Sequence, residues 1–504
     1  MGGVVSTIKL LIAFSWSLRS AIAPVVKRIQ SDPGKPCENP TESFWLQEPH
    51  PVVSQHQSDE LPSEVDVVII GSGITGTAIA KTLLEPPNGK KTEKPLSVAM
   101  LDAREACSGA TGRNGGHIKE SAYSEYESLK NKHGKKMAME IIRFRLAHLD
   151  ALIAVAEAEG EEMLRHSQIR KCDTLDICFE EESWEGMKYQ LRLFLRDFED
   201  QRGLWLLHEK YETRKLYPFP SASGAISSPA GALWPYRFVT SILNRLLKSH
   251  PHFSLDTSTP VLSVTTSESH PSHYLVSTPR GNILAKHVVH ATNAHAAHLL
   301  PGLRGLVFPV RGHMTAQRPT QGGCAFGEHK DRSFSFTYNE GFDYVTQVPP
   351  PDGEGDTMVL IGGALFQTGN FGFGEVGATD EDMNIFASAH LAGIVGTVTG
   401  KHGATMTEGA WTGVMGFTPD LMAWVGPVPV SMTGGRERPE GGKEWVSAGY
   451  CGEGMVNAWL SGVAVGRMIN GEDGGDVGLP KVMLCTEERA RKADLLDLVN
   501  EYLG

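Results

Sequence analysis

The residues best suited to chemistry form a glycine turn between two apolar segments. The turn, GSGITG at 71–76, has the spacing G-x-G-x-x-G; a β-branched run at 65–70 precedes it, and small and apolar residues at 77–84 follow at helical spacing. The first glycine permits a tight turn, the second lets a pyrophosphate approach the backbone, and the third lets helix and strand pack closely. The N–H groups and dipole of the helix would face the diphosphate. The pattern predicts a dinucleotide site.

A carboxylate stands where such a site needs one. Asp102 ends a second apolar segment, residues 97–101, that is expected to be the next strand. In that position a carboxylate accepts hydrogen bonds from the ribose hydroxyls and repels a 2′-phosphate. The bound nucleotide is therefore expected to contain an unphosphorylated adenosine.

The loop after Asp102 indicates which of two common dinucleotides, FAD or NAD, the site would bind. Residues 104–118, REACSGATGRNGGHI, contain four glycines, two arginines and an Asn-Gly-Gly sequence. NAD enzymes have no obvious need for such a loop here, whereas a flavin needs backbone amides around its pyrophosphate and ring. An ordinary surface loop is the alternative interpretation. The loop favours FAD over NAD.

GSGITG, Asp102 and SGATGRNGG together resemble the FAD-dependent oxidoreductases of the D-amino-acid oxidase type, which include glycine, sarcosine and γ-glutamylputrescine oxidases. The resemblance covers most of the chain after residue 60 and recurs in blocks at 290–294, 309–314, 411–426 and 449–462. It implies an α/β fold: a Rossmann-like FAD-binding domain with a parallel sheet, plus an antiparallel-sheet α+β substrate domain. The expected divisions are a leader and linker at 1–62, the FAD-binding domain with a helical insertion at 63–307, the substrate domain at 308–408, and a return to the FAD-binding domain with a C-terminal helix at 409–504.

The glycine pattern and the resemblance mark the residues expected to contact FAD. The backbone near Val261 is implied to contact adenine, and Ala291 lies in a small-residue turn that lets the flavin approach. The glycine turn at 449–454 precedes a helix whose N-terminus would stabilise a reduced, anionic flavin. The FAD is expected to be dissociable, because Cys451 is not where the covalent cysteine of sarcosine oxidases would be expected. The full set is Gly71, Gly73, Ile74, Thr75, Gly76, Asp102, Ala103, Arg104, Ser108, Thr111, Arg113, Asn114, Gly115, Gly116, Val261, Ala291, Gly426, Gly452, Glu453, Gly454 and Met455.

The chemistry implied is oxidation of a C–N bond to an imine, with the flavin accepting a hydride or its equivalent from a carbon bearing a neutral amine. His117 and His313 are expected near the ring, although each could equally be a hydrogen-bonded core histidine. Tyr344 and Trp411 are candidate pocket walls, although aromatic residues in such positions more often belong to the core. No metal site is expected.

The expected substrate is a small-molecule amine or amino acid, and O2 is a candidate electron acceptor. Family members that oxidise amino acids commonly carry an arginine before the T-P-D-type segment, but residues 413–420, GVMGFTPD, contain none. This favours an amine, or a carboxylate held by another group, with Arg311 as the nearest candidate. A flavin monooxygenase and a non-catalytic FAD-binding protein are the competing interpretations. The absence of a second G-x-G-x-x-G for a nicotinamide counts against the monooxygenase.

Composition limits the other possibilities. The net charge of −12 over 504 residues argues against nucleic acid as a partner, because phosphate neutralisation requires a basic face. The seven cysteines are odd in number, scattered and without zinc-type spacing, which fits a reducing compartment better than a disulfide framework. A chain of this length is expected to form two domains plus a leader.

The leader allows several readings. Its apolar run at 10–16 is far shorter than the roughly 20 residues of a membrane span, and no firm membrane evidence exists. A secretory signal, a mitochondrial transit peptide, a myristoylation motif at 1–6 and a disordered or loosely helical tail all remain open. A cytoplasmic or mitochondrial location is favoured over secretion. Residues 31–62 read as a linker, within which the segment 43–46 (SFWL) is expected to pack back on the domain.

Overall fold

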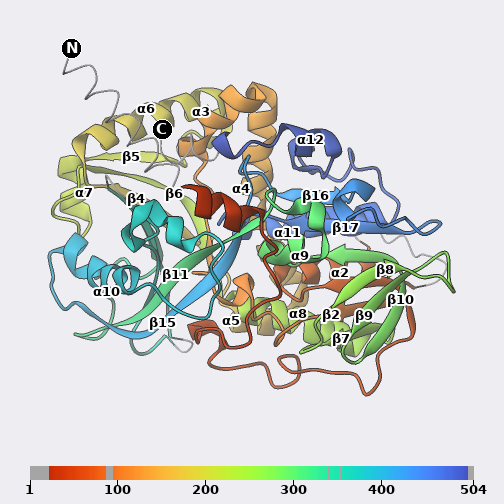
Figure 1. Ribbon diagram of the computed structural model, residues 1–504. Coiled ribbons are helices and arrows are strands. Elements are labelled where there is room, and N and C mark those ends of the chain that lie inside the picture. Colours follow the sequence, from red (N-terminus) through yellow and green to blue (C-terminus); the bar gives the residue numbers. More distant parts are fainter. Residues whose placement is uncertain (1–21, 87–94, 339–340, 351–352, 498–504) are drawn as a thin grey trace, which may run out of the picture.

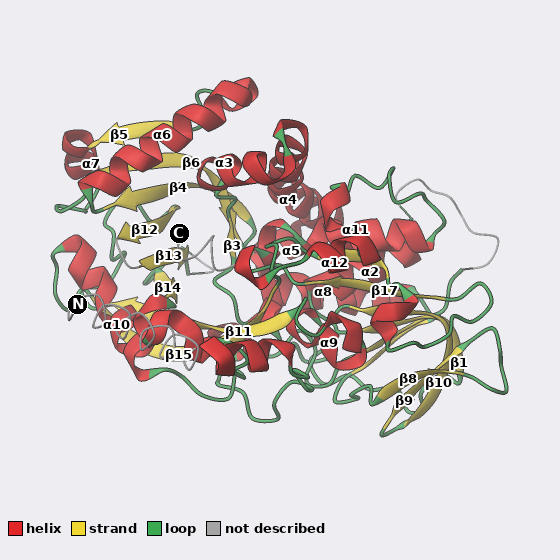
Figure 2. Cartoon of the chain, turned by 45° about the horizontal axis from the view of Figure 1, so that its top comes forward, coloured by secondary structure: helices red, strands yellow, loops and turns green. Residues whose placement is uncertain are grey.

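The computed structural model describes residues 22–86, 95–338, 341–350 and 353–497 (Figure 1). Two β-sheets organise these residues. Sheet A holds the amino-terminal glycine turn, and sheet B lies beside it with helices on its outer sides (Figure 2). This is the α/β arrangement that the sequence predicts.

Sheet A is mainly parallel, as expected. Its central strand, β1, pairs in parallel with both β2 and β10, and parallel pairing continues to β7 and β17. Val67, Val68 and Ile69 are fully buried because both faces of the sheet are covered. The segment around Val261 precedes the strand β8, which begins at Ser263, since Pro260 has no N–H to donate to a ladder. In spatial order the sheet contains β16 (Trp424–Pro427), β17 (Lys443–Ala448), β10 (Gly281–His290), β1 (Glu64–Ile70), β2 (Val98–Leu101) and β7 (Phe253–Asp256), with β8 (Ser263–Thr266) and β9 (Tyr274–Thr278) attached to β10.

Sheet B is mainly antiparallel, with one parallel pair between β12 and β4. Its strands between residues 308 and 363 lie in the predicted substrate domain, and they are joined by strands from residues 117–232, which lie within the predicted FAD-binding domain. β15 also continues to Phe417, past residue 408. Sheet B therefore extends beyond both predicted limits of the substrate domain, residues 308 and 408, and those limits stay a prediction. Its order is β15 (Thr405–Phe417), β11 (Phe308–Pro319), β14 (Met358–Gly363), β13 (Gly341–Val348), β12 (Arg332–Tyr338), β4 (Arg170–Cys178), β6 (Gly224–Ala232) and β3 (His117–Ile118), with β5 (Leu206–Glu209) beside β6.

The helices cover the sheets and close the fold. Trp184, Leu191 and Phe194 of α6 are buried, so this helix packs its apolar side inward over β4, β5 and β6 (Figure 2). Within the predicted helical insertion, Gly134 separates two helices: its φ of 80° ends α3 and starts α4. The helices are α2 (Ile74–Leu84), α3 (Ala122–His133), α4 (Lys135–Glu159), α5 (Glu161–Ser167), α6 (Glu181–Asp197), α7 (Lys210–Leu216), α8 (Pro235–Ser249), α9 (Ala296–Leu299), α10 (Ile385–Thr399), α11 (Ala458–Ile469) and α12 (Glu487–Lys492).

Helices α2 and α11 lie against each other with their N-termini at the same end. A Cβ on Gly462 would approach the Thr75 carbonyl oxygen to 2.8 Å, and one on Gly466 would approach the Thr82 side chain to 2.7 Å. Small residues therefore let the two backbones pack closely. The consequence is that two helix N-termini open toward one region of the molecule.

The described part of the leader is ordered: residues 22–30 are helical, not disordered, and the linker expected at 31–62 packs on the fold. Residues 22–30 form a helix, drawn in red near the centre of Figure 1, whose Val25 and Ile29 are buried in a cluster with Phe308. Arg28 anchors this helix by donating to the carbonyls of Val376 and Phe373 at 2.7 and 2.6 Å. Residues 1–21, with the candidate targeting motifs, lie outside the described residues.

The segment Ser43 to Leu46 packs back on the domain, as predicted. Trp45 is 1% exposed, its indole meets Trp234 edge to face at 4.9 Å, and its N–H donates to the Asn114 carbonyl. Burial of so large an aromatic surface explains why this part of the leader is fixed. In the described ranges no helix is both long and apolar enough to cross a bilayer.

Candidate active site

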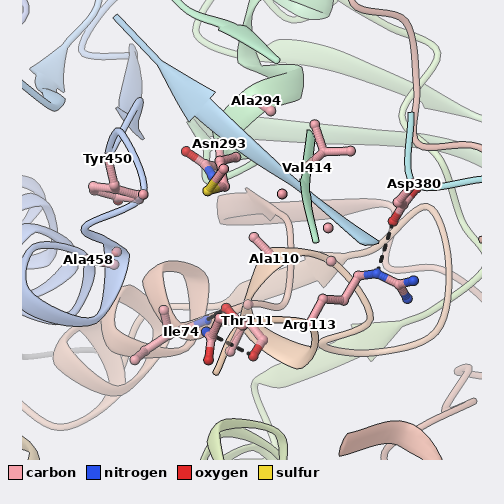
Figure 3. A pocket seen from close by; sticks show the side chains of 18 of the residues that line it. Ile74, Ala110, Thr111, Arg113, Asn293, Ala294, Asp380, Val414, Tyr450 and Ala458 are labelled. Atoms are coloured by element: carbon pink, nitrogen blue, oxygen red, sulfur yellow. Dashed lines mark hydrogen bonds and ion pairs between the residues drawn. The ribbon is translucent and has the colours of Figure 1, made fainter. Parts of the chain in front are cut away.

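A cavity of about 480 Å³ lies between the two sheets. Sheet A contributes the carboxyl ends of β1 and β2, the helices contribute the N-termini of α2 and α11, and sheet B contributes β3 and β11 to β14. Figure 3 shows this region, with Ile74 and Ala458 at the two helix starts. The predicted residues that line it are Gly71, Gly73, Ile74, Thr75, Asp102, Ala103, Arg104, Thr111, Arg113, Asn114, Gly115, His117, Val261, Ala291, His313, Tyr344, Gly452, Glu453, Gly454 and Met455.

Five predicted residues lie outside the cavity lining. Gly76 packs against the Gly71 carbonyl, Gly116 lies against the Leu233 carbonyl, and the hydroxyl of Ser108 is buried. Gly426 lies in β16 beside Leu484 and does not reach this cavity. Trp411, the candidate pocket wall, is fully buried in the core instead, and its N–H donates to the Arg113 carbonyl at 2.7 Å.

Asp102 stands at the end of the cavity formed by sheet A. One carboxylate oxygen, Oδ2, accepts from the N–H and hydroxyl of Ser72 at 2.9 and 2.5 Å, and Oδ1 accepts from the Arg104 N–H at 3.1 Å. Burial raises the pKa of this carboxyl above its ordinary value, against the hydrogen bonds from Ser72. The carboxylate is thus fixed in orientation and retains lone pairs for a ribose.

We expect the Asp102→Ala variant to bind FAD more weakly by about 1–3 kcal/mol, because hydrogen bonds to a charged acceptor would be lost. Fluorescence titration of the flavin-free protein measures the dissociation constant, and the melting temperature of the same sample checks that the Ser72 turn is intact. Equal affinities in the variant and the parent would place the ribose elsewhere.

The residues at the sheet A end fit a dinucleotide. The N-caps of α2 and α11, Gly73 and Asn457, make no side-chain cap hydrogen bond. The Ile74 N–H donates to the Thr111 hydroxyl at 3.1 Å and the Leu460 N–H to the His148 ring at 3.2 Å, so the dipole and the remaining first-turn N–H groups of each helix face the cavity. Gly71 has a φ of 107°, and a Cβ there would lie 2.6 Å from the Ala291 carbonyl oxygen. This turn therefore accepts only glycine and keeps the approach to the backbone open.

Two arginines of the predicted loop share one carboxylate. Asp380 accepts from Arg104 at 3.2 and 3.0 Å and lies 3.3 Å from Nε of Arg113, as the dashed line in Figure 3 shows. The guanidinium of Arg113 is almost fully buried, and its pKa is lowered to about 10, first by burial. The cluster holds one positive charge in excess, which suits a pyrophosphate nearby.

A segment of the leader covers this cluster, and we call residues 31–41 the strap. Gly34, Lys35 and Pro36 of the strap line the cavity. The Cys37 thiol donates to Asp380 at 3.0 Å, and the Thr41 N–H donates to the Asp380 carbonyl at 2.8 Å. Sequence reasoning missed both the strap and Asp380, because these contacts join residues more than 300 positions apart and neither partner belongs to a motif.

The sheet B end holds the two predicted histidines, and both are hydrogen bonded. Nε2 of His117 lies 2.8 Å from the Ser333 hydroxyl, and its ring stacks on Tyr344 at 5.9 Å. Nε2 of His313 accepts from the Asn384 N–H at 3.1 Å. Burial lowers the pKa of His117 to about 3 and that of His313 to about 4, so both are neutral near pH 7. They line the cavity as uncharged groups.

A lysine that sequence reasoning missed lies beside them. Lys119 lines the cavity, and its ammonium donates to Asp176 at 2.6 Å and to the Ser335 hydroxyl at 3.1 Å. His117 and Lys119 are two positions apart at the β3 strand, the spacing that places side chains on one face. That alternation was the available signal. Arg311, the expected carboxylate partner, is outside the lining and donates to Glu375 at 2.6 Å and to Asp382 instead.

A parallel sheet with a glycine turn, facing an antiparallel wall across one cavity, defines a nucleotide-dependent oxidoreductase of the two-domain flavoprotein class. Residues 66–468 match the protein-family model "DAO: FAD dependent oxidoreductase". The chain belongs to this family, and its cofactor is FAD. A search of curated proteins gives no match.

Solved structures share the fold at low identity. Glycine oxidase from Geobacillus kaustophilus superposes with a TM-score of 0.62 at 18% identity, covering 84% of this chain and 99% of that one. L-proline dehydrogenase from P. horikoshii gives 0.58 at 18% identity, over 83% and 96%. FAD-bound L-alpha-glycerophosphate oxidase from Mycoplasma pneumoniae gives 0.54 at 15% identity, over 81% and 95%. At these sequence identities, the similarities show that the fold is shared and do not identify a substrate.

Proposed function

We propose that this flavoenzyme oxidises the C–N bond of a small amine to an imine. The observation that carries the proposal is the charge of the sheet B end. Among the described residues that line the cavity, the lysines and arginines are Lys35, Arg104, Arg113 and Lys119. The first three lie with the strap, and Lys119 is already paired with Asp176. A substrate carboxylate would therefore find no uncommitted cation at this end, and burying it unpaired would be costly.

Bound FAD would supply the two-electron acceptor. The chain's own residues then have to orient the substrate and exclude water. Tyr344, Phe342 and Met314 give the sheet B end an apolar wall, with the Tyr344 hydroxyl directed to the Met314 sulfur at 3.2 Å. Burial raises the pKa of Tyr344 to about 12, so it stays a neutral phenol. A neutral, apolar wall suits the alkyl part of an amine.

We expect primary or secondary alkylamines to reduce the flavin at least about tenfold faster than glycine or D-alanine, which corresponds to about 1.4 kcal/mol in the barrier. Anaerobic stopped-flow bleaching of the purified flavoprotein with both substrate sets measures this. The Arg311→Leu variant serves as a control and should leave the ratio unchanged, because that side chain is committed to Glu375 and Asp382. Faster reduction by the amino acids would contradict the proposal.

The other candidate functions predict different results in the same flavin-reduction assay. L-alpha-glycerophosphate oxidase, as its name says, acts on a substrate other than an amine, so the fold alone does not determine that a C–N bond is oxidised. Reduction of the flavin by glycerol phosphates but not by amines would favour oxidation of a C–O bond. Bleaching only by NADPH would indicate a monooxygenase, and bleaching by none would favour a non-catalytic FAD-binding role. Reoxidation by air would support O2 as the electron acceptor.

We also propose that the FAD is held without a covalent bond. The described residues that line the cavity include no cysteine. Cys451, which stands between the lining residues Tyr450 and Gly452, has its thiol 3.4 Å from the Thr418 hydroxyl, and burial raises its pKa to about 12. A protonated, hydrogen-bonded thiol is a poor nucleophile.

A further inference from the structure

One carboxylate of the cavity has no partner. Glu453 lies in the glycine turn before α11, lines the cavity, and belongs to a turn that packs against α4 and β3. The Glu453 carboxylate makes no hydrogen bond and no ion pair with any residue that the structure describes, although its backbone groups bond to Tyr450 and Asn457. A half-buried carboxylate without a partner is costly unless a ligand supplies one.

The cations around Glu453 are committed to other acids. Arg145 of α4 lies 2.5 Å from Glu125 and 3.4 Å from Glu120, both on or next to α3. Glu120 is itself 4% exposed, and its Oε2 has no partner. Lys119 is taken by Asp176. Burial raises the pKa of Glu120 well above its ordinary value, whereas Glu125 and Asp176 occupy Arg145 and Lys119. Neither cation is therefore left to pair with Glu453.

Glu453 and the wall formed by sheet B line the same cavity. Burial raises the pKa of the Tyr344 phenol on that wall, and the charge of Glu453 adds a smaller contribution in the same direction. Tyr344, Phe342 and the neutral His117 line the cavity on that wall, and the Lys119 ammonium lies 5.9 Å from the centroid of the Phe342 ring. A free carboxylate and aromatic rings in one cavity suit an organic ammonium group.

We propose that Glu453 is the specificity-determining residue of this cavity and holds the cationic nitrogen of the substrate amine. The inference rests on the proposed function and names the residue that selects its substrate class. Binding pairs an alkylammonium with the free carboxylate and places the alkyl part against Tyr344 and Phe342. Within this pair a proton can pass from nitrogen to oxygen: one N–H bond breaks, one carboxyl O–H bond forms, and no electrons are exchanged. The product is the neutral amine that oxidation requires.

The pH dependence follows from the carboxyl group. Burial, followed by the charge of Glu125, raises the pKa of Glu453 to about 7, while Arg145 and Lys119 oppose the shift. The group is ionised above this value and protonated below it. Affinity for a permanently charged ammonium should therefore be full at about pH 8 and fall progressively below about pH 7.

The first experiment uses ligands that cannot be oxidised. tert-Butylamine has no hydrogen on its α-carbon, and pivalate and tert-butanol are its anionic and neutral counterparts of similar shape. Binding to the FAD-loaded protein is followed by perturbation of the flavin spectrum and by calorimetry. We expect the ammonium to bind at least about tenfold more tightly than either counterpart at about pH 8. Equal binding of all three, or preference for pivalate, would overturn the inference without any variant.

The second experiment compares two acid-to-amide variants. Glu453→Gln should weaken ammonium binding at least about tenfold and abolish its pH dependence. Glu125→Gln, a matched change in the same cluster but outside the lining, should keep the affinity at about pH 8 and move the midpoint of the pH dependence downward. Flavin content and melting temperature confirm folding in both. Unchanged ammonium binding in Glu453→Gln would overturn the assignment.

The two experiments distinguish failure of the proposed amine oxidation from failure of the proposed ammonium site. If no amine reduces the flavin but tert-butylammonium still binds through Glu453, the oxidation is wrong and the ammonium site stands. If amines reduce the flavin and Glu453→Gln binds tert-butylammonium as the parent does, the oxidation stands and the ammonium site is wrong.

Discussion

The Gly76→Ala variant is expected to purify with little or no flavin. A Cβ at Gly76 would lie 2.0 Å from the carbonyl oxygen of Gly71, and it would also press on the Ile69 side chain at 3.3 Å. Because the Gly71 carbonyl belongs to the backbone and cannot rotate away as a side chain could, the added Cβ would force open the turn that carries the pyrophosphate-binding amides. Disordering this turn should weaken the binding of FAD by at least about 100-fold, which corresponds to about 2.7 kcal/mol. The ratio of flavin to protein absorbance and a titration with FAD measure the loss.

Gly186→Ala provides the matched control. Gly186 lies within α6, and a Cβ there would meet no atom within 4 Å. Alanine in an open helical position should stabilise the protein slightly, by about 0.5–1 kcal/mol, with full flavin content. Full flavin content in Gly76→Ala as well would show that the turn tolerates the change and that its close packing does not support cofactor binding.

The Asp380→Ala variant should lower the free energy of unfolding by about 3–5 kcal/mol, because it leaves two largely buried guanidinium groups without their common partner. The side chains of Arg113 and Asp380 are 1% and 4% exposed. The same change removes the Cys37 hydrogen bond and loosens the strap. Urea unfolding of the flavin-free protein measures the difference. Asp173→Ala is the control, since the Asp173 side chain is 61% exposed and its ion pair with Arg332 is expected to be worth at most about 1 kcal/mol.

The pH dependence of this contribution has a definite sign. Burial opposes ionisation of Asp380, but Arg104 and then Arg113 outweigh it and hold the pKa below the ordinary value of 3.8. A depressed pKa means that the stabilisation is complete above the ordinary value and is lost as the pH falls through the lower, folded-state value. The difference between parent and variant should therefore be constant near neutrality and shrink in acid. A difference that grew in acid would contradict the assignment.

Local patterns account for what the sequence predicted correctly. The path from β1 through the glycine turn to α2 and Asp102 depends on neighbours in the chain, and so do the alternating strands of sheet B. Contacts between distant segments decided the rest. Trp411 has the pattern of a wall residue, yet its partner is the Arg113 carbonyl, which only the folded chain brings near. Asp380 lies in no motif and acquires its role from Arg104, Arg113 and the strap.

The strap also orders events during synthesis. It comes early in the chain, but the residues that fix it come late: the Asp380 carboxylate, and Thr412, whose N–H donates to the Thr41 hydroxyl at 2.9 Å. Domains generally fold as units, so the strap can reach these two anchors only after residue 412 has been made. Closing the strap over Arg104 and Arg113 is therefore a late step in folding, although the strap itself is among the first segments of the chain to be synthesised.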